Sequence, residues 1–308
     1  MVKKKISIIA PIYNESENIS EFYDSVINVI REIDYIFQII FINDGSRDNS
    51  LLELLKIKDK TDNVLIIDFT RNFGKQAALT AGINLCDADA AITIDTDLQD
   101  PPGVICDLIK EWENGSELVH AIKNDREKDS FLKRNSSSMF YKIVNLFTQV
   151  NVPENSGDFK LIDKKGIEMI KKFPEKTRWI SGITNWLGLS DSKVYFRRPA
   201  RKSGKAMGAV TLLRMGFDAF FSFSNVPLKI ALYTGVFFAI TSFIYGIKII
   251  VNAIFFDIAV QGYASMMTGI IFFGGLQLIV LGVIGEYISR IFLEVKNRPI
   301  YLISKIYE

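Results

Sequence analysis

Short apolar runs alternate with helical patterns over the first 121 residues. Each run is four to six residues long, which is the usual length of a buried strand. We predict strands at Ile6–Ala10, Phe37–Ile42, Val64–Phe69, Ala90–Ile94 and Leu118–Ala121, and helices near Glu17–Glu32, Asn49–Asp59, Lys75–Leu85 and Pro102–Asn114. Strands joined by crossover helices predict an α/β fold with a largely parallel, Rossmann-like sheet.

The C-terminal part of the chain carries two long apolar runs. The 18 residues of Ile230–Ile247 hold no charge, and the run continues to Phe256 with only Lys248 interrupting it. The second run, Ala264–Gly285, contains 22 uncharged residues. About 20 apolar residues span a bilayer as a helix, so we predict a two-helix transmembrane hairpin. Two buried core helices are the alternative.

Basic residues flank both ends of this hairpin, whereas the short loop inside it carries one acid. The flanking residues are Arg214, Lys229, Lys296, Arg298 and Lys305. Because positive charge marks the cytoplasmic side, we expect a multi-pass protein of the inner (cytoplasmic) membrane with its N-terminal domain and both termini in the cytoplasm. The predicted organisation is a cytoplasmic domain at 1–206, an interfacial amphipathic segment at 207–229, two transmembrane helices at 230–293 (about 230–256 and 264–288), and a cytoplasmic tail at 294–308.

Overall charge is nearly balanced, with 37 basic and 35 acidic side chains and a net charge of +2. Nucleic-acid-binding domains need a strongly basic surface, so no nucleic-acid partner is expected. The single histidine, His120, lies in a predicted strand, and no second histidine supports a metal site or a catalytic triad. We expect His120 to be structural.

An acidic cluster directly follows the predicted strand Ala90–Ile94. Asp95, Asp97 and Asp100 lie within six residues, and carboxylates at i and i+2 of a turning chain can converge on one ion. Carboxylate oxygens suit Mg²⁺ or Mn²⁺ shared with substrate phosphates. The alternative is a solvated acidic turn that caps the helix after Pro102.

Polar residues also follow the first three predicted strands. They are Pro11, Tyr13, Asn14 and Glu15 after the first, Asn43, Asp44, Gly45 and Ser46 after the second, and Arg71, Asn72, Phe73, Gly74 and Lys75 after the third. Ligands of open α/β sheets bind beyond the carboxyl ends of the strands, so an acid there could bind a ribose or a base edge. Alternatively, Asp44 and Ser46 cap the next helix, and Lys75 is an exposed base at a helix start.

Several longer stretches together resemble the polyprenyl-phosphate glycosyltransferases of glycosyltransferase family 2, which include dolichyl-phosphate mannose synthases and bactoprenol glucosyltransferases. The stretches are PIYNESENI, FINDGSRDNS, TRNFGKQAALTAG, DTDLQDPP, FLKRNSSSMFYK, NSGDFKLID, FSFSNVPLK and LGVIGEYISRIFLEVKNRP. The resemblance covers nearly the whole chain. It implies a GT-A catalytic domain, a nucleotide-sugar donor, a divalent metal and inversion at the anomeric carbon.

The resemblance also implies roles for individual positions. Asp95, Asp97 and Gln99 match the metal and donor motif, and Asp158, with Asp97, matches the catalytic carboxylates. The implied donor-binding residues are Pro11, Tyr13, Glu15, Asp44, Lys75, Asp95, Arg126 and Arg134. The three basic residues among them, Lys75, Arg126 and Arg134, match positions near phosphates. Arg134 could instead be a loop charge, and Asp158 a turn residue after Gly157.

The chemistry of the implied acceptor limits what Asp158 has to do. A phosphate monoester has a second pKa of about 6 and is mostly anionic at neutral pH, so it hardly needs a base. We therefore expect Asp158 mainly to orient the donor sugar or a cationic neighbour, or to stabilise oxocarbenium character, with deprotonation secondary.

The segment after Arg201 departs from the family pattern. Methionine, Met207, occupies the position where the family has a lysine. Lys205 or Lys202 is expected to substitute for it beside the acceptor phosphate, together with Arg201. The following phenylalanine-rich stretch predicts a helix lying on the membrane surface, with a plain core helix as the alternative.

The predicted activity is inverting transfer of a hexose, with glucose from UDP-glucose preferred, to undecaprenyl phosphate at the cytoplasmic membrane face. The product would be a lipid-linked sugar for O-antigen or cell-envelope glycan modification. UDP-GlcNAc, UDP-galactose and GDP-mannose are alternative donors, and a processive polysaccharide synthase or a non-catalytic membrane scaffold is an alternative class. Expected partners are the membrane lipid, a second copy of the chain, and a flippase and a downstream transferase of the same pathway.

Overall fold

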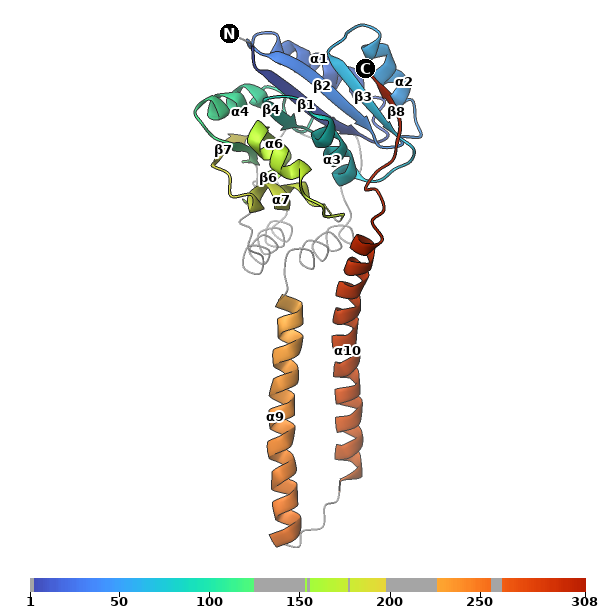
Figure 1. The fold of residues 1–308 in the computed structure, drawn as a ribbon, viewed down its shortest axis with the longest axis vertical. Coiled ribbons are helices and arrows are strands. Elements are labelled where there is room, and N and C mark those ends of the chain that lie inside the picture. The colour runs from blue at the N-terminus through green and yellow to red at the C-terminus, as the bar shows by residue number, and fades with distance from the viewer. Residues whose placement is uncertain (1–2, 125–152, 154–155, 177, 198–225, 256–261) are drawn as a thin grey trace. The chain divides into compact units, whose positions relative to one another are not determined.

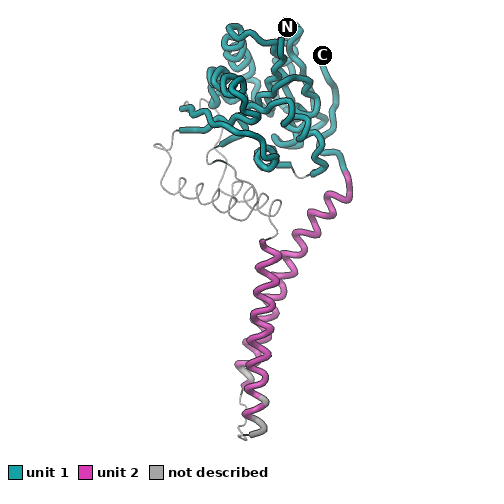
Figure 2. The backbone as a smooth tube through the Cα atoms, turned by 60° about the vertical axis from the view of Figure 1, so that its left-hand side comes forward, with its two compact units in different colours: residues 1–216, 298–308 teal, residues 217–297 magenta. Residues whose placement is uncertain are grey.

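The computed structural model describes residues 3–124, 153, 156–176, 178–197, 226–255 and 262–308. The chain divides into two compact units, which Figure 2 colours separately. Residues 1–216 with 298–308 form the first unit, and residues 217–297 form the second.

One mixed sheet forms the centre of the first unit, with the strand order β7-β5-β6-β4-β1-β2-β3-β8 (Figure 1). The strands are β1 (Lys5–Ile12), β2 (Ile36–Asn43), β3 (Val64–Phe69), β4 (Ala90–Thr93), β5 (Leu118–Lys123), β6 (Ser156–Asp163), β7 (Asp191–Phe196) and β8 (Ile303–Tyr307). The strands predicted from the apolar runs correspond to β1 to β5, whereas β6, β7 and β8 were not predicted.

The strand order reverses on either side of β1. The chain runs outward from β1 through β2 to β3, and then crosses back to place β4 on the other side of β1. These pairings are parallel, so the carboxyl ends of β1 and β4 lie side by side at the same edge. Crevices at such a reversal are where open α/β sheets bind ligands.

Strand β6 is inserted antiparallel between β4 and β5. Its apolar residues Phe159 and Leu161 alternate with Asp158 and Lys160. A period of two therefore sends the apolar pair to one face of the sheet and the charged pair to the other. Because charged residues interrupt its apolar pattern, this strand was not predicted from the sequence. Asp158 therefore lies in a strand, and the alternative that it is a turn residue is wrong.

Helices cover both faces of the sheet, because central strands such as β1, β2 and β4 are apolar on both sides. One face packs on α1 (Ile19–Ile30), α2 (Ser50–Lys58) and α4 (Val104–Glu113), through core residues such as Phe22, Phe41 and Leu108. The other face packs on α3 (Lys75–Leu85), α6 (Lys164–Lys171) and α7 (Ile180–Trp186). All four predicted helices correspond to α1 to α4, with ends shifted by up to two residues.

The C-terminal residues complete the sheet, although the sequence predicted only a tail there. Strand β8 pairs antiparallel with β3, and the amide of Thr70 donates to the carbonyl of Leu302 at 3.0 Å. The ring of Tyr301 stacks on Phe69 at 5.1 Å between centroids, and its hydroxyl accepts a hydrogen bond from Asn84 at 3.1 Å. The last residues are thus anchored to the strand that leads into α3.

The second unit contains two long helices, α9 (Val226–Phe255) and α10 (Tyr263–Val295). Both are long and apolar enough to cross a membrane, over Val226–Ile249 and Ser265–Val295, and neither is buried inside the protein. Phe238 of α9 contacts Phe272 and Phe273 of α10 at 5.7 and 5.6 Å between ring centroids. The buried-core alternative is therefore wrong for these helices, and a helical hairpin is confirmed.

The Tyr301 contacts yield a stability prediction. We expect Tyr301→Ala to lower the free energy of unfolding by about 2 kcal/mol, because it removes an aromatic stack and a hydrogen bond. Tyr301→Phe keeps the stack and should cost only about 1 kcal/mol. Thermal unfolding of the purified variants measures both, and equal losses would show that the ring stack contributes nothing.

Candidate active site

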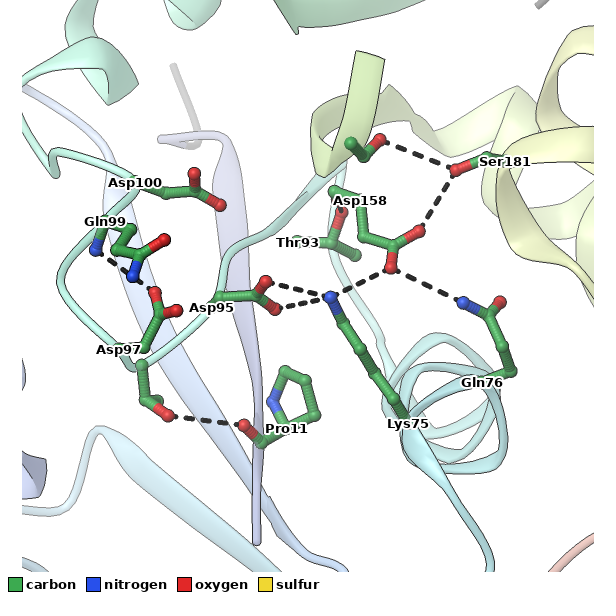
Figure 3. Close-up of polar contacts among 12 residues, drawn as sticks. Pro11, Lys75, Gln76, Thr93, Asp95, Asp97, Gln99, Asp100, Asp158 and Ser181 are labelled. Carbon is green, nitrogen blue, oxygen red and sulfur yellow. Dashed lines mark hydrogen bonds and ion pairs between the residues drawn. The ribbon is translucent and has the colours of Figure 1, made fainter. Parts of the chain in front are cut away.

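Acidic residues collect where β1 and β4 end (Figure 3). Asp95 follows β4 by two residues and is partly exposed. The hydroxyl of Thr96 donates to the carbonyl of Pro11 at 3.5 Å, which ties the segment after β4 to the end of β1. The acidic turn and the β1 end predicted to share a site are therefore brought together.

Lys75 joins two carboxylates from different parts of the chain (Figure 3). Its Nζ lies 2.7 and 2.8 Å from the two oxygens of Asp95 and 2.9 Å from Oδ2 of Asp158. Burial by itself would lower the pKa of the ammonium, but Asp95 and Asp158 outweigh it and hold this pKa above its ordinary value. Lys75 therefore bridges the two carboxylates and offsets the repulsion between them.

Both carboxylate oxygens of Asp158 are held. Oδ1 accepts from the hydroxyl of Ser181 at 3.0 Å, and Oδ2 accepts from the Gln76 amide at 3.4 Å as well as from Lys75. Burial would raise the pKa of Asp158, but Lys75 and Lys160 bring it down to about 2. Asp158 is consequently a fixed anion at physiological pH.

The acidic turn after Asp95 is tightly built. The amide of Gln99 donates to Oδ1 of Asp97 at 3.1 Å, Leu98 adopts a positive φ of 58°, and Asp100 lies 3.8 Å from the Nζ of Lys123. The side-chain nitrogen of Gln99 is buried and has no hydrogen-bond partner among the described residues. The Asp97 side chain and the Lys123–Asp100 ion pair thus hold the turn in place, so it is not a loose solvated loop.

A divalent metal fits this donor set only with help from a substrate. Within the described ranges, no group of three or more histidine, cysteine or acidic side chains is arranged to hold a metal ion. Asp95 and Asp97 supply carboxylate oxygens, and Mg²⁺ and similar ions are often held by one or two carboxylates plus substrate phosphates. The residues present therefore fit a metal that arrives with a phosphorylated ligand.

Asp44 clamps the loop that leads into α3. Its oxygens accept hydrogen bonds from the amides of Phe73 and Gly74 at 2.6 and 2.9 Å and from the Asn72 side chain at 3.0 Å. Burial raises the pKa of Asp44, and the two amide hydrogen bonds partly oppose the shift. The alternative that Asp44 and Ser46 cap the next helix is wrong, because α2 begins at Ser50 and Asp48 accepts from its amide.

Glycine is required beside this clamp. Gly45 has a φ of +61°, and a Cβ there would lie 2.2 Å from the carbonyl carbon of Arg71. No side chain fits that space. The two loops therefore meet backbone to backbone, and their contact fixes where Lys75 begins α3.

The segment after β1 contacts the segment after β2. The amide of Asn14 donates to the hydroxyl of Ser46, and that of Glu15 to the hydroxyl of Ser50, each at 3.0 Å. Tyr13 beside them is 44% exposed. These residues rim the same edge of the sheet as the acidic cluster.

Four predicted site residues lie outside the described residues. They are Arg126, Arg134, Arg201 and Lys205. The same holds for Lys202, for Met207 and for most of the predicted interfacial segment, residues 207–225. Their expected phosphate contacts stay predictions.

Three residues around Asp158 were not singled out from the sequence. Gln76 follows Lys75 directly, and its side-chain oxygen Oε1 accepts a hydrogen bond from the amide of Ile180 at 2.8 Å, at the start of α7. Ser181 gave no signal, because its place depends on the packing of α7 against β6. Lys160 could have been noticed as a lone charge inside an apolar strand; it is fully buried.

His120 is structural in the sense expected. It is fully buried in β5, and neither ring nitrogen has a hydrogen-bond partner among the described residues. Burial, with Lys160 and Lys193 adding to it, lowers the pKa of the ring to about 3. His120 is therefore neutral at physiological pH.

Comparison with solved structures supports the fold. The structure of glucosyl-3-phosphoglycerate synthase from Mycobacterium tuberculosis with Mn²⁺, uridine diphosphate and glucosyl-3-phosphoglycerate matches with a TM-score of 0.51 and 17% identity, over 71% of this chain and 78% of that chain. The mixed Rossmann-like sheet is thus that of the GT-A fold, as predicted.

Sequence comparison identifies the family. The glycosyl transferase family 2 model matches residues 7–170, and the GtrB C-terminal hairpin model matches residues 226–291. A bactoprenol glucosyl transferase from Shigella phage SfX is 42% identical over 97% of this chain and 99% of its own. A prophage bactoprenol glucosyl transferase homologue from Escherichia coli is 40% identical over 98% of this chain and 99% of its own. The chain therefore belongs to glycosyl transferase family 2 and is a glycosyltransferase.

Proposed function

We propose that this glycosyltransferase moves a hexose, with glucose from UDP-glucose preferred, onto undecaprenyl phosphate or a related polyprenyl phosphate. The observation that carries the proposal is the Asp95, Lys75 and Asp158 cluster at the strand reversal, in a chain that also has an apolar helical hairpin. The similarity to bactoprenol glucosyl transferases along almost the whole chain supports the lipid acceptor.

In this proposal the nucleotide lies at the ends of β1 and β2, near Pro11, Tyr13, Glu15 and Asp44. Exposed Tyr13 offers a ring face to a base, and the Asp44 clamp keeps the surrounding loops in place. Lys75 points toward the diphosphate, and Arg126 and Arg134 are proposed to contact phosphates from a segment outside the described residues.

Asp95, Asp97 and Gln99 would hold Mg²⁺ or Mn²⁺ together with the donor diphosphate. When bound, the metal would neutralise the charge that develops on the departing nucleoside diphosphate. Lys75 already lies against Asp95, so this carboxylate is positioned to face a cation. The structural relative solved with Mn²⁺ and uridine diphosphate is consistent with such a site.

Asp158 is proposed to act as an anion rather than as a base. Its pKa of about 2 makes it a poor proton acceptor beside a phosphate monoester with a pKa of about 6. A fixed negative charge near the anomeric carbon would instead stabilise oxocarbenium character in the transition state. The acceptor phosphate oxygen attacks this carbon in a single displacement, which inverts its configuration.

The hairpin is proposed to hold the enzyme at the cytoplasmic face of the inner membrane, where Arg201 and Lys205 would bind the acceptor phosphate. The chain leaves the catalytic unit, passes through α9 and α10, and returns to the catalytic sheet as β8. Because the chain enters the hairpin from the catalytic unit and returns to that unit in sequence, we propose that both ends of the hairpin lie in the cytoplasm. The product then needs a flippase and a downstream transferase to reach O-antigen or another envelope glycan. We also propose that two copies of the chain associate through small residues of the hairpin helices.

The first prediction from the proposed function concerns the reaction itself. We expect transfer of labelled sugar from one nucleotide sugar of a UDP- and GDP-sugar panel to undecaprenyl phosphate, detected as butanol-extractable label that requires Mg²⁺ or Mn²⁺. Asp97→Ala should lower this transfer by a factor on the order of 100 or more, because the metal loses a ligand. Absence of lipid-linked label with any donor, from folded protein in membranes, would refute the lipid-acceptor proposal.

The second prediction concerns the charge of Asp158. Asp158→Asn keeps the size and most hydrogen bonds but removes the charge, so kcat should fall by a factor on the order of 100 to 1,000. Asp107→Asn, which neutralises an exposed carboxylate on α4, is the matched control and should keep wild-type kcat. Retained activity in Asp158→Asn would contradict an electrostatic role.

The third prediction separates metal binding from turnover. Lys75→Met removes the cation that lies against Asp95, so Mn²⁺ should bind more tightly without donor, on the order of tenfold by calorimetric titration. Transfer should nevertheless fall, because the diphosphate loses a basic partner. Lys110→Met, on the exposed face of α4, is the control; unchanged Mn²⁺ affinity in Lys75→Met would mean that the metal does not bind at Asp95.

A further inference from the structure

Lys160 is a fully buried lysine on the same strand as Asp158. Lys160 follows Asp158 by two residues on β6, so both side chains lie on the same face of the sheet. The side chain of Lys160 is fully buried, whereas that of Asp158 is 17% exposed. Lysine is almost never fully buried unless it is paired, so the position calls for a specific reason.

The contacts of Lys160 lead directly to Asp158. Its Nζ donates to the hydroxyl of Ser181 at 2.8 Å, and that hydroxyl donates to Oδ1 of Asp158 at 3.0 Å. A hydroxyl can accept one hydrogen bond and donate another, so the ammonium polarises the hydroxyl toward the carboxylate. Figure 3 shows Ser181 and Lys75 on different oxygens of Asp158.

The two lysines differ in exposure to solvent. The side chain of Lys75 is 41% exposed and is shared between Asp95 and Asp158. In the proposed function it turns toward the donor diphosphate, which weakens its hold on Asp158. Lys160 is fully buried on β6 and hydrogen-bonded to Ser181 of α7, so Asp158 keeps one nearby cation as long as Lys160 is charged.

We propose that Lys160, acting through Ser181, is a positioning residue that keeps Asp158 anionic and correctly oriented while Lys75 engages the donor. This inference rests on the proposed function and adds a second, internal cation to it. Lys160 touches neither donor nor acceptor and transfers no proton in the reaction.

The surroundings of Lys160 make its charge sensitive to pH. Burial lowers the pKa of Lys160 to about 8, with Asp158 opposing the shift and Lys75 adding to it. On the neighbouring strand β5, His120 pairs with Lys160 in the sheet and is neutral; on β7, Lys193 pairs with His120. Lys160 is charged below about pH 8 and neutral above it.

The test compares pH profiles of lipid-linked transfer. Wild-type kcat should fall as the pH rises from 7 to 9, and this decline should shrink in Lys160→Arg, because guanidinium stays charged. Lys160→Met and Ser181→Ala should each lower kcat at pH 7 on the order of 10- to 100-fold. Lys193→Met removes a lysine from the same row of the sheet and should keep the wild-type profile.

Thermal unfolding of the same variants separates positioning from support of the fold. Because burial holds the pKa of Lys160 below its ordinary value, the charged side chain is disfavoured in the folded chain relative to the unfolded one, so Lys160→Met should unfold no earlier than wild type at pH 7 although it is less active. The unfolded lysine has a pKa of about 10.4, so the burial penalty is fully present below pH 8. Between about pH 8 and 10.4 the lysine is neutral in the folded chain but still protonated in the unfolded chain, so the burial penalty falls as the pH rises. Over this pH range, the free energy of unfolding of wild type should increase relative to that of Lys160→Met.

The possible outcomes are distinct. Equal alkaline declines in wild type and Lys160→Arg, or wild-type kcat in Lys160→Met, would overturn the inference while leaving the proposed function intact. If Lys160→Met lowers kcat and also unfolds at a lower temperature than wild type, Lys160 is a structural residue and the positioning role is refuted. No product from wild type with any donor would remove the proposed function and the inference with it.

Discussion

Charge balance where the carboxyl end of β4 meets the amino end of β6 is the constraint on which the site depends. Asp95 and Asp158 arrive from different strands and face the same ammonium group of Lys75. Without that cation, the two carboxylates would repel each other in a partly buried site. The placement of Lys75, at the first residue of α3, therefore decides whether the site can exist as an anionic cluster.

The placement of Lys75 is itself the result of several loop contacts. Asp44 holds the amides of Phe73 and Gly74, and Gly45 lets the loop backbone approach Arg71. From the other side, Tyr301 stacks on Phe69 at the end of β3. The C-terminal strand thus supports the same loop that carries the site cation, so the residues that follow the hairpin contribute to the architecture of the catalytic unit.

This arrangement favours a mechanism based on fixed charges. Asp158 has two cations near it, one exposed and one buried, and its pKa of about 2 keeps it ionised throughout the physiological range. An acceptor that is already an anion needs orientation and charge stabilisation more than proton removal. The proposed lipid phosphate is such an acceptor, and a preorganised site of this kind suits it.

The sequence by itself determined the parts of the protein that depend on local patterns. Apolar runs marked β1 to β5 and both hairpin helices, and the acidic turn after β4 pointed to the site, because periodicity and strand ends are written in consecutive residues. Strand β6 was not predicted because Asp158 and Lys160 interrupt its apolar pattern. Strand β8 was not predicted because it is an edge strand outside the predicted α/β unit and has little hydrophobic pattern. Only the tertiary structure decided that Lys75 bridges Asp95 and Asp158 and that Ser181 links Lys160 to Asp158. Those contacts join residues at least 20 positions apart, and their geometry depends on how α3 and α7 pack on the sheet, which no local pattern specifies.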